Sequence, residues 1–281
     1  MNINTLIEKG SKILRESDVL SYKIDSELLL SKVINKDRIF LITNGKHKVS
    51  SKKIKNYFEK IYRRQKKEPL AYILGKKEFY SLDFEVNNNV LVPRPDSEII
   101  VEQVLKKYTE KTCLKILDIG TGSGCLLLSI LKKLNKSYGT GIDKSIKALN
   151  IAKNNSKKHN LLNRTRFVNC DVDNFNFGNY DVIVSNPPYI CSHKINDLSE
   201  DIRRFEPKMA LDGGSTGLNV VNKVIVNAVR LLKTNGYLFL EIGSDQITKV
   251  SRILMQNKFK IARIQNDYAN NIRCIISTRL I

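Results

Sequence analysis

The segment LKILDIGTGSG (114–124) decides the fold of this 281-residue chain. Its first part, 114–119, is apolar and predicts a buried strand, and a helix is predicted over 123–134. Glycines at 120, 122 and 124 lie at the junction. A glycine-rich turn lets the backbone approach a ligand closely, and the N–H groups at the start of a helix point toward that ligand. The segment therefore predicts a nucleotide-type binding loop.

The spacing of the glycines limits which nucleotide can bind. A dinucleotide fingerprint, G-x-G-x-x-G, would need its third glycine at Cys125, where this chain has none. No lysine follows the loop at the spacing of a Walker A motif either. The loop therefore disfavours NAD and a nucleoside triphosphate.

Outward from the loop, strands and helices alternate as in a doubly wound parallel sheet with right-handed crossovers. After the loop, further strands are predicted over 138–142, 165–169 and 180–185, and a helix over 145–158. The remaining predicted elements are a helix near 216–233, a strand ending at Glu241, a helix near 246–256, and strands near 259–264 and 272–278. The last two strands lack an intervening helix, so we expect an antiparallel hairpin at one edge of the sheet.

Residues 2 to about 67 are predicted to be helical. Ile54, Tyr57, Phe58 and Ile61 recur at the spacing of one buried helix face. The other face is basic, with ten Lys or Arg residues from Lys46 to Lys67. This face either contacts RNA or an acidic protein surface, or is simply solvated.

A linker follows this helical region. Pro69 ends the region, and 78–86 alternates like a strand or hairpin. A helix then begins at Pro95 and Asp96. We therefore predict three parts: an N-terminal helical domain (1–70), a β-hairpin linker (71–94) and a catalytic domain (95–281).

Composition narrows the class of protein further. The net charge of +20 favours polyanionic partners such as RNA, but a biased genome would also produce it. The five cysteines are scattered and never spaced as C-x-x-C, which argues against disulfides and a zinc site, and we expect no metal. No apolar stretch resembles a membrane span or a signal peptide, so a cytoplasmic protein is expected.

Asp143 is a candidate ligand-binding residue outside the glycine-rich loop. It ends the strand after the loop, about 20 residues downstream, where a carboxylate can accept the hydroxyl protons of a ribose. The alternative is that Asp143 only caps the helix that starts at Ser145. An adenine ring would then lie near Asp171 and Val172, at the end of the third strand.

The tetrapeptide Asn186-Pro187-Pro188-Tyr189 follows the buried strand 180–185, at the sheet edge where such folds bind ligands. Two prolines fix φ and remove two N–H donors, so carbonyl oxygens face outward. The Asn186 side-chain oxygen and the Pro187 carbonyl can each accept one hydrogen of an –NH2 group, and Tyr189 offers a flat face to a planar amide or base. We therefore expect an S-adenosylmethionine-dependent N-methyltransferase without an ionised base. The polar segments 205–207 and 212–214 form either a lid or a connection.

Several longer segments make the chain resemble the HemK/PrmC-type protein-(glutamine-N5) methyltransferases, which modify peptide chain release factors. The similarity extends over nearly the whole chain. The segments that carry it are EPLAYILGKKEFYSLDFEV (68–86), VLVPRPDSE (90–98), DIGTGSG (118–124), VSNPPYI (184–190) and FEPKMALDGGSTGL (205–218).

The resemblance implies a class I methyltransferase fold, α/β and Rossmann-like, with a seven-stranded sheet, a reversed last strand and a small N-terminal helical domain that binds the release factor. It implies methylation of the glutamine in the Gly-Gly-Gln loop. By position, S-adenosylmethionine would contact Gly120, Thr121, Gly122, Ser123, Gly124, Asp143, Val172 and Asn186. The glutamine would contact Asn186, Pro187, Pro188 and Tyr189. Val172 stands where relatives often have an aromatic residue beside the adenine.

Two other activities remain open at this point. A ribosomal-protein glutamine methyltransferase would share the tetrapeptide, and an adenine-N6 methyltransferase would offer an amine with the same two hydrogens. Direct nucleic-acid binding is compatible with the charge but is not required by the release-factor assignment. A non-catalytic RNA-binding module is disfavoured by the intact loop and tetrapeptide.

Overall fold

The computed structural model describes residues 1–279 and divides the chain into two compact units. The first unit comprises Met1–Lys76 together with Ser199–Phe205, and the second comprises Lys77–Leu198 and the chain from Glu206 onward. The last two residues of the predicted domain 95–281 lie outside the described residues. No helix within residues 1–279 has the length and apolar character needed to cross a membrane.

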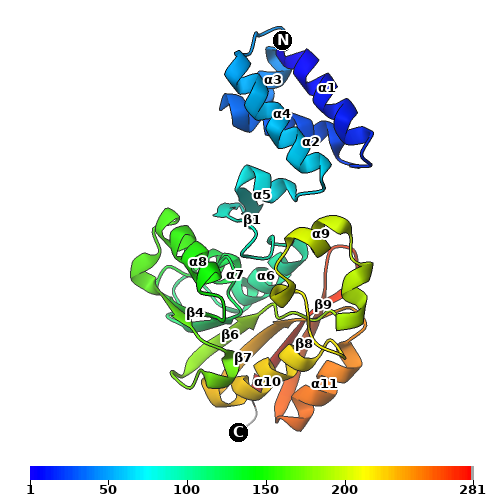
Figure 1. Ribbon diagram of the computed structural model, residues 1–281. Coiled ribbons are helices and arrows are strands. Elements are labelled where there is room, and N and C mark those ends of the chain that lie inside the picture. The colour runs from blue at the N-terminus through cyan, green and yellow to red at the C-terminus, as the bar shows by residue number, and fades with distance from the viewer. Residues whose placement is uncertain (280–281) are drawn as a thin grey trace. The chain divides into compact units, whose positions relative to one another are not determined.

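The first unit consists of helices (Figure 1). Their bounds are α1 Ile3–Arg15, α2 Tyr22–Ile34, α3 Arg38–Thr43, α4 Ser51–Gln65 and α5 Leu70–Leu74, with α9 Glu200–Phe205 from the later segment. The predicted face of α4 is confirmed, because Tyr57 and Ile61 are fully buried in the core of this unit. The Tyr57 hydroxyl lies 2.7 Å from Ser26 Oγ and donates to the carbonyl of Leu6 at 3.1 Å.

Two features of this unit were not predicted. Pro69 does not end the helical region, because helix α5 begins at the next residue. The C-cap of helix α5 is Gly75, whose φ is +69°. Proline has a fixed φ and needs no N–H donor at a helix start, so it can begin a helix as readily as end one. Helix α9 follows a polar loop and carries no buried residue that would signal it.

The second unit begins with the predicted hairpin, β1 Lys76–Phe79 and β2 Leu82–Glu85. A seven-stranded sheet follows in the order β5-β4-β3-β6-β7-β9-β8. Its strands are β3 Lys115–Ile119, β4 Tyr138–Asp143, β5 Thr165–Asn169, β6 Tyr180–Ser185, β7 Leu232–Glu241, β8 Phe259–Asn266 and β9 Ile272–Arg279. The first five of these run parallel, and β9 is antiparallel to both β7 and β8. The reversed last strand is therefore confirmed, and it lies inside the sheet, between β7 and β8.

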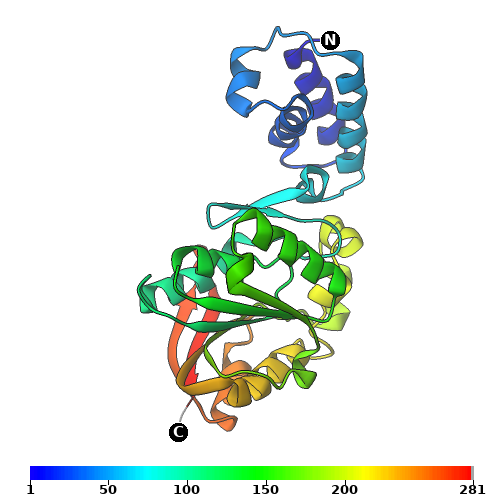
Figure 2. The same ribbon diagram turned by 90° about the vertical axis from the view of Figure 1, so that its left-hand side faces the viewer.

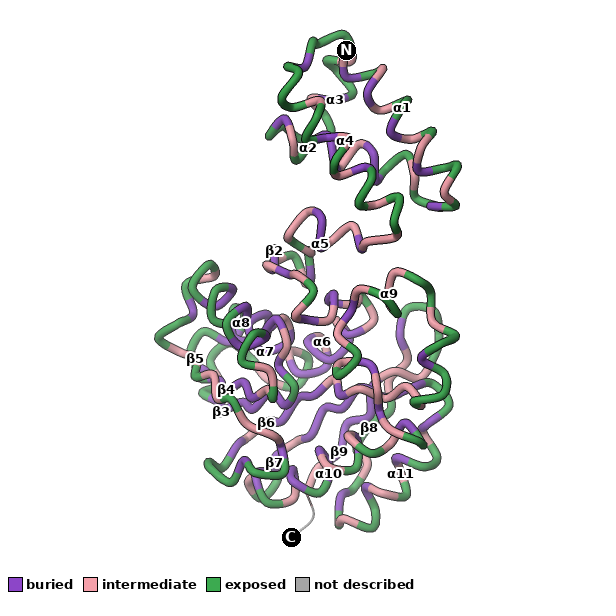
Figure 3. The backbone as a smooth tube through the Cα atoms, in the orientation of Figure 1, coloured by how far each residue is buried: buried purple, intermediate pink, exposed green. Residues whose placement is uncertain are grey.

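Helices cover both faces of this sheet (Figures 1 and 2). Their bounds are α6 Glu98–Lys107, α7 Cys125–Lys133, α8 Ile146–Lys158, α10 Asn219–Leu231 and α11 Ile247–Gln256. Alternate residues of each strand face opposite layers, so Ile116 packs in one hydrophobic cluster with α6 and α7, and Leu117 packs in another with α10 and α11. Burial on both faces explains why the central strands β3 and β6 are mostly apolar (Figure 3).

Candidate active site

A pocket in the second unit opens where the parallel strands end. The last residue of β3, Ile119, lies opposite Ile142 of β4 and Ser185 of β6. The chain proceeds from β3 outward to β4 and β5, and then returns to place β6 on the other side of β3. Ligands of such sheets bind at this change of direction. Ser185 Oγ donates to the Ile119 carbonyl at 2.7 Å and holds the two strand ends together.

The glycine loop folds back on the end of β4. Gly120, Gly122 and Gly124 have φ of +73°, +54° and +80°, in the left-handed region that favours glycine. The N–H groups of Gly120 and Thr121 donate to the Ile142 carbonyl at 2.9 and 3.0 Å. Gly120, Thr121, Gly122 and Ser123 line the pocket, whereas Gly124 is not among its described lining residues and acts at the start of α7.

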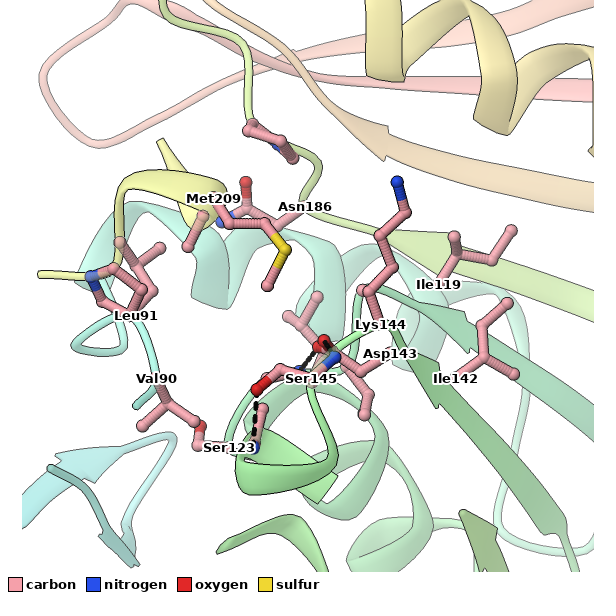
Figure 4. Close-up of a pocket in the computed structure, with 18 of the residues that line it drawn as sticks. Val90, Leu91, Ile119, Ser123, Ile142, Asp143, Lys144, Ser145, Asn186 and Met209 are labelled. Atoms are coloured by element: carbon pink, nitrogen blue, oxygen red, sulfur yellow. Dashed lines mark hydrogen bonds between the residues drawn. The ribbon is translucent and has the colours of Figure 1, made fainter. Parts of the chain in front are cut away.

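Asp143 both lines the pocket and fixes the loop. Its Oδ2 accepts the Gly122 N–H and its Oδ1 accepts the Ser145 N–H, each at 2.9 Å (Figure 4). Burial raises the pKa of this carboxyl, and the two backbone N–H groups partly offset the increase. Each oxygen retains a second lone pair. The capping alternative is wrong, because the N-cap of α8 is Ser145, whose side chain accepts the Ala148 N–H, and Asp143 holds the turn before the helix. Asp143 can still accept ribose hydroxyls.

Asp118 is a fully buried acid directly beneath the loop. Its Oδ2 accepts a hydrogen bond from Thr121 Oγ1 at 2.7 Å. Oδ1 makes no hydrogen bond to any residue between 1 and 279. Burial raises the pKa of Asp118 to about 7, with a further increase from the nearby Asp143. The Thr121 hydroxyl is thus engaged by Asp118 in the interior.

The opposite wall comes from segments distant in sequence. Val90 and Leu91, together with Met209, lie across the pocket from Asp143 (Figure 4). Glu206 joins the two segments, since its Oε1 accepts from Arg94 Nη2 at 2.6 Å and its Oε2 accepts from the Val92 N–H at 3.2 Å. An ion pair between a buried carboxylate and a half-buried Arg94 fixes this wall.

The adenine region expected from the sequence also lines the pocket. Val172 is buried in a 3-10 turn after β5, and Asp171 pairs with Lys144 across the pocket floor at 2.6 Å. Ile142 and Ala148 add apolar surface. A glycine loop, a carboxylate at a strand end and an apolar floor match the phosphate-free adenosine and methionine parts of S-adenosylmethionine, so the residues present fit this cofactor.

The tetrapeptide is divided between the pocket and the interior. Asn186 and Pro188 line the pocket, whereas Pro187 is buried and Tyr189 is not among the described lining residues. The Tyr189 hydroxyl donates to Glu241 Oε1 at 3.4 Å, and burial raises its pKa to about 12. The structure therefore brings Asn186 beside the glycine loop and Asp143, and turns the Tyr189 hydroxyl away from them.

The segment 211–217 fixes the tetrapeptide from behind. Its backbone bonds to Ile190 in both directions, through Leu211 and Gly213. A side chain at Gly213 would lie 2.8 Å from the Pro188 carbonyl, and one at Gly217 would lie 2.5 Å from the Tyr189 carbonyl. These glycines allow the close approach of two backbones. In the structure this segment is a packed support of the tetrapeptide.

Sequence reasoning assigned no role to three side chains that contact the tetrapeptide, Ser97, Glu241 and Arg273, or to Glu206 in the opposite wall. Asn186 Nδ2 donates to Ser97 Oγ at 2.9 Å, and Arg273 Nη1 donates to the Tyr189 hydroxyl at 3.3 Å. One of them carried a usable signal, since Glu241 is an acid that ends the apolar strand YLFLE (237–241).

Comparisons with known proteins agree with this geometry. Residues 5–75 match the model of the PrmC N-terminal domain, and residues 95–203 match that of the methyltransferase small domain. A crystal structure of a methyltransferase from Pyrococcus furiosus shares the fold, with a TM-score of 0.55 and 20% identity over 73% of this chain and 92% of the other.

The chain is thus a class I S-adenosylmethionine-dependent methyltransferase. It is 38% identical to the release factor glutamine methyltransferase of Clostridium acetobutylicum over 99% of both chains. It is 37% identical to that of Clostridium botulinum over 98% of both. The chain belongs to the release factor glutamine methyltransferase family.

Asp143→Asn is expected to weaken S-adenosylmethionine binding about tenfold or more, because hydrogen bonds to a charged acceptor contribute about 1.5–3 kcal/mol. Calorimetric titration measures the dissociation constant. Asp181→Asn is a matched control, since Asp181 also accepts a backbone N–H, that of Lys115, but lies at the other end of the sheet. Equal affinity of Asp143→Asn and the wild type would rule out the ribose contact.

Asp118→Asn is expected to flatten the dependence of stability on pH. With a pKa of 3.8 when unfolded and about 7 when folded, Asp118 binds more protons in the folded state between these values. The free energy of unfolding therefore falls as pH rises from 4 to 7. At about 1.4 kcal/mol per pKa unit, the loss is on the order of 4 kcal/mol.

Urea denaturation of both proteins at pH 5 and pH 8 measures this difference. The neutral amide can still accept from Thr121, so the variant retains the hydrogen bond but does not titrate. Parallel pH dependences of wild type and variant would contradict the assignment of a raised pKa to Asp118.

Proposed function

We propose that the chain transfers a methyl group from S-adenosylmethionine to the side-chain N5 of the glutamine in the Gly-Gly-Gln loop of peptide chain release factors. The observation that carries the proposal is the position of Asn186, which lines the same pocket as the glycine loop and Asp143. The near full-length similarity to enzymes named for release factor glutamine methylation supports this substrate over a ribosomal protein or an adenine.

The cofactor supplies a sulfonium-bound methyl group, which is a strong electrophile. The chain's own residues then have to bind the glutamine side chain and orient its amide nitrogen. Asn186 Oδ1 accepts one N–H of the glutamine amide, and the Pro187 carbonyl is proposed to accept the other, so that the nitrogen faces the methyl group. Such positioning can lower a barrier by roughly 7–11 kcal/mol. The nitrogen gains the methyl group, releases one proton to water and leaves the cofactor as the neutral thioether.

The remaining residues of the proposed site divide by role. Gly120 to Gly124, Asp143 and Val172 would hold the cofactor, while Pro188 and Tyr189 would complete the glutamine site. For Tyr189, the ring rather than the hydroxyl would serve, because the hydroxyl is engaged by Glu241 and Arg273. An ordinary planar amide suits a site of this kind, since it needs no charged partner.

We further propose that the N-terminal helical unit binds the release factor outside the glutamine loop, through the basic face of α4. Some of the basic residues between Lys46 and Lys67 make contacts within the helical unit. Arg64 pairs with the buried Asp25 at 2.7 Å, and Lys67 donates to the Ser17 carbonyl. Lys52 and Lys55 are exposed and offer charge to a partner. Neither a membrane nor a nucleic acid is needed in this account, and the reaction belongs in the cytoplasm, where release factors act.

Asn186→Ala is expected to lower kcat for release factor methylation at least a hundredfold, because the acceptor that orients the glutamine amide is lost. Mass spectrometry of the release factor detects the added methyl group on the glutamine. Asn222→Ala, at an exposed position of α10, is the control and should leave activity unchanged. Transfer by the wild type to an oligonucleotide but not to a release factor would contradict the proposed function.

Lys52→Glu with Lys55→Glu is expected to raise the KM for the release factor about tenfold and to leave kcat unchanged, since exposed ion pairs contribute about 0.2–1 kcal/mol each. The control is Lys153→Glu with Lys157→Glu on α8, which changes the net charge equally. Equal effects of the two double variants would show that only overall charge matters and would contradict a docking role for α4.

A further inference from the structure

We propose that Ser97 and Glu241 are positioning residues that fix the orientation of the Asn186 carboxamide, so that its oxygen faces the methyl-accepting nitrogen. The inference rests on the proposed function and adds two residues to its machinery. Neither residue belongs to the glycine loop or the tetrapeptide. Ser97 is among the residues that line the pocket, whereas Glu241 is not among its described lining residues.

The first observation is the hydrogen bond that holds the amide. Asn186 Nδ2 donates to Ser97 Oγ at 2.9 Å, and Ser97 is only 2% exposed. Ser97 ends a 3-10 turn, Pro95–Ser97, whose proline restricts the backbone at its first residue. With the amide nitrogen held by Ser97, the amide oxygen is left for the remaining space of the pocket, which both residues line.

The second observation explains why Ser97 accepts rather than donates toward Asn186. The carboxyl of Glu241 is 1% exposed and ends β7 beside Ser97. The Ser97 hydroxyl lowers the pKa of this carboxyl, while burial raises it to about 7. Glu241 Oε2 makes no hydrogen bond to any residue within 1–279, so this oxygen is available to accept the Ser97 proton. A hydroxyl has one proton.

The third observation is that the other neighbours of Glu241 also donate toward it. The Tyr189 hydroxyl donates to Glu241 Oε1 at 3.4 Å, and Arg273 Nη1 donates to that hydroxyl at 3.3 Å. Arg273 is held in turn by Asp267 at 3.1 Å and by Asp96 at 3.4 Å. Glu241 thus accepts a hydrogen bond from Tyr189 of the tetrapeptide, and in the proposed arrangement the Ser97 proton is directed to the same carboxyl.

Rotation of the Asn186 carboxamide by half a turn would disrupt this hydrogen-bond arrangement. Its oxygen would face Ser97 and draw the serine proton away from Glu241, leaving a buried carboxyl with a weaker set of donors. Its –NH2 group would face the pocket and meet the –NH2 group of the substrate glutamine, donor against donor. The rotated form is thus disfavoured by the interior and is unable to orient the substrate.

The kinetic test compares Ser97→Ala, Ser97→Thr and Glu241→Gln with the wild type. Ser97→Ala and Glu241→Gln should lower kcat for release factor methylation at least tenfold, with KM and the dissociation constant of S-adenosylmethionine changed less than twofold. Ser97→Thr keeps the hydroxyl and should retain most of the activity. Ser129→Ala is the matched control, because Ser129 is a fully buried serine in α7 whose hydroxyl bonds to no residue of the described chain.

A second measurement reports on the amide without any substrate. In the wild type, the Asn186 side-chain N–H signals, assigned by their loss in Asn186→Ala, should exchange slowly with solvent in NMR spectra. They should exchange at least tenfold faster in Ser97→Ala and stay slow in Ser129→Ala. Unchanged exchange in Ser97→Ala, or an unchanged kcat in that variant, overturns the positioning role.

The two readouts separate this inference from the proposed function. If the wild type fails to methylate a release factor, the proposed function fails, and the exchange of the Asn186 amide alone decides whether Ser97 holds it. If Ser97→Ala does not fold, Glu241→Gln carries the same kinetic and exchange tests, since a neutral side chain of nearly equal size occupies the same place.

Discussion

The reversal of strand order between β3 and β6 is the constraint on which the site depends. It leaves the carboxyl ends of the parallel strands β3, β4, β5 and β6 at one edge of the sheet. The glycine loop, Asp143, the Asp171 turn and the tetrapeptide each follow one of these strands directly. The hydrogen bond of Ser185 with the Ile119 carbonyl joins the two strands where the direction changes.

Much of this frame could be predicted because the information is local. The strands β3 and β6 are mostly apolar, and the observed bounds of the central strands lie within a residue or two of those expected, as at β4 and β6. Three parts were missed for different reasons. Helix α5 directly follows a proline, which the sequence suggested as a helix end, and α9 has no buried residue that would mark it as a helix. The position of β9 between β7 and β8 depends on strand pairing between distant segments, which no local pattern shows.

The site shows the same division between local and distant information. The glycines, Asp143 and Asn186 were found because each follows a predicted strand in sequence. Ser97, Glu206 and Arg273 were not, since their partners lie 89, 112 and 84 residues away. Hydrophobic periodicity carries no information about which polar side chains meet behind a loop. Glu241 broke a local pattern, and such breaks tend to mark functional sites.

The charges around the tetrapeptide explain why its first residue is an amide rather than an acid. Burial already raises the pKa of Glu241 to about 7, and a carboxylate at position 186 would place a second acid beside the same serine. It would also lack the N–H that Ser97 accepts from Asn186. A neutral carboxamide supplies a donor to the interior and an acceptor to the pocket with no charge to desolvate. The residue proposed to face the substrate must therefore suit the protein interior as well as the pocket.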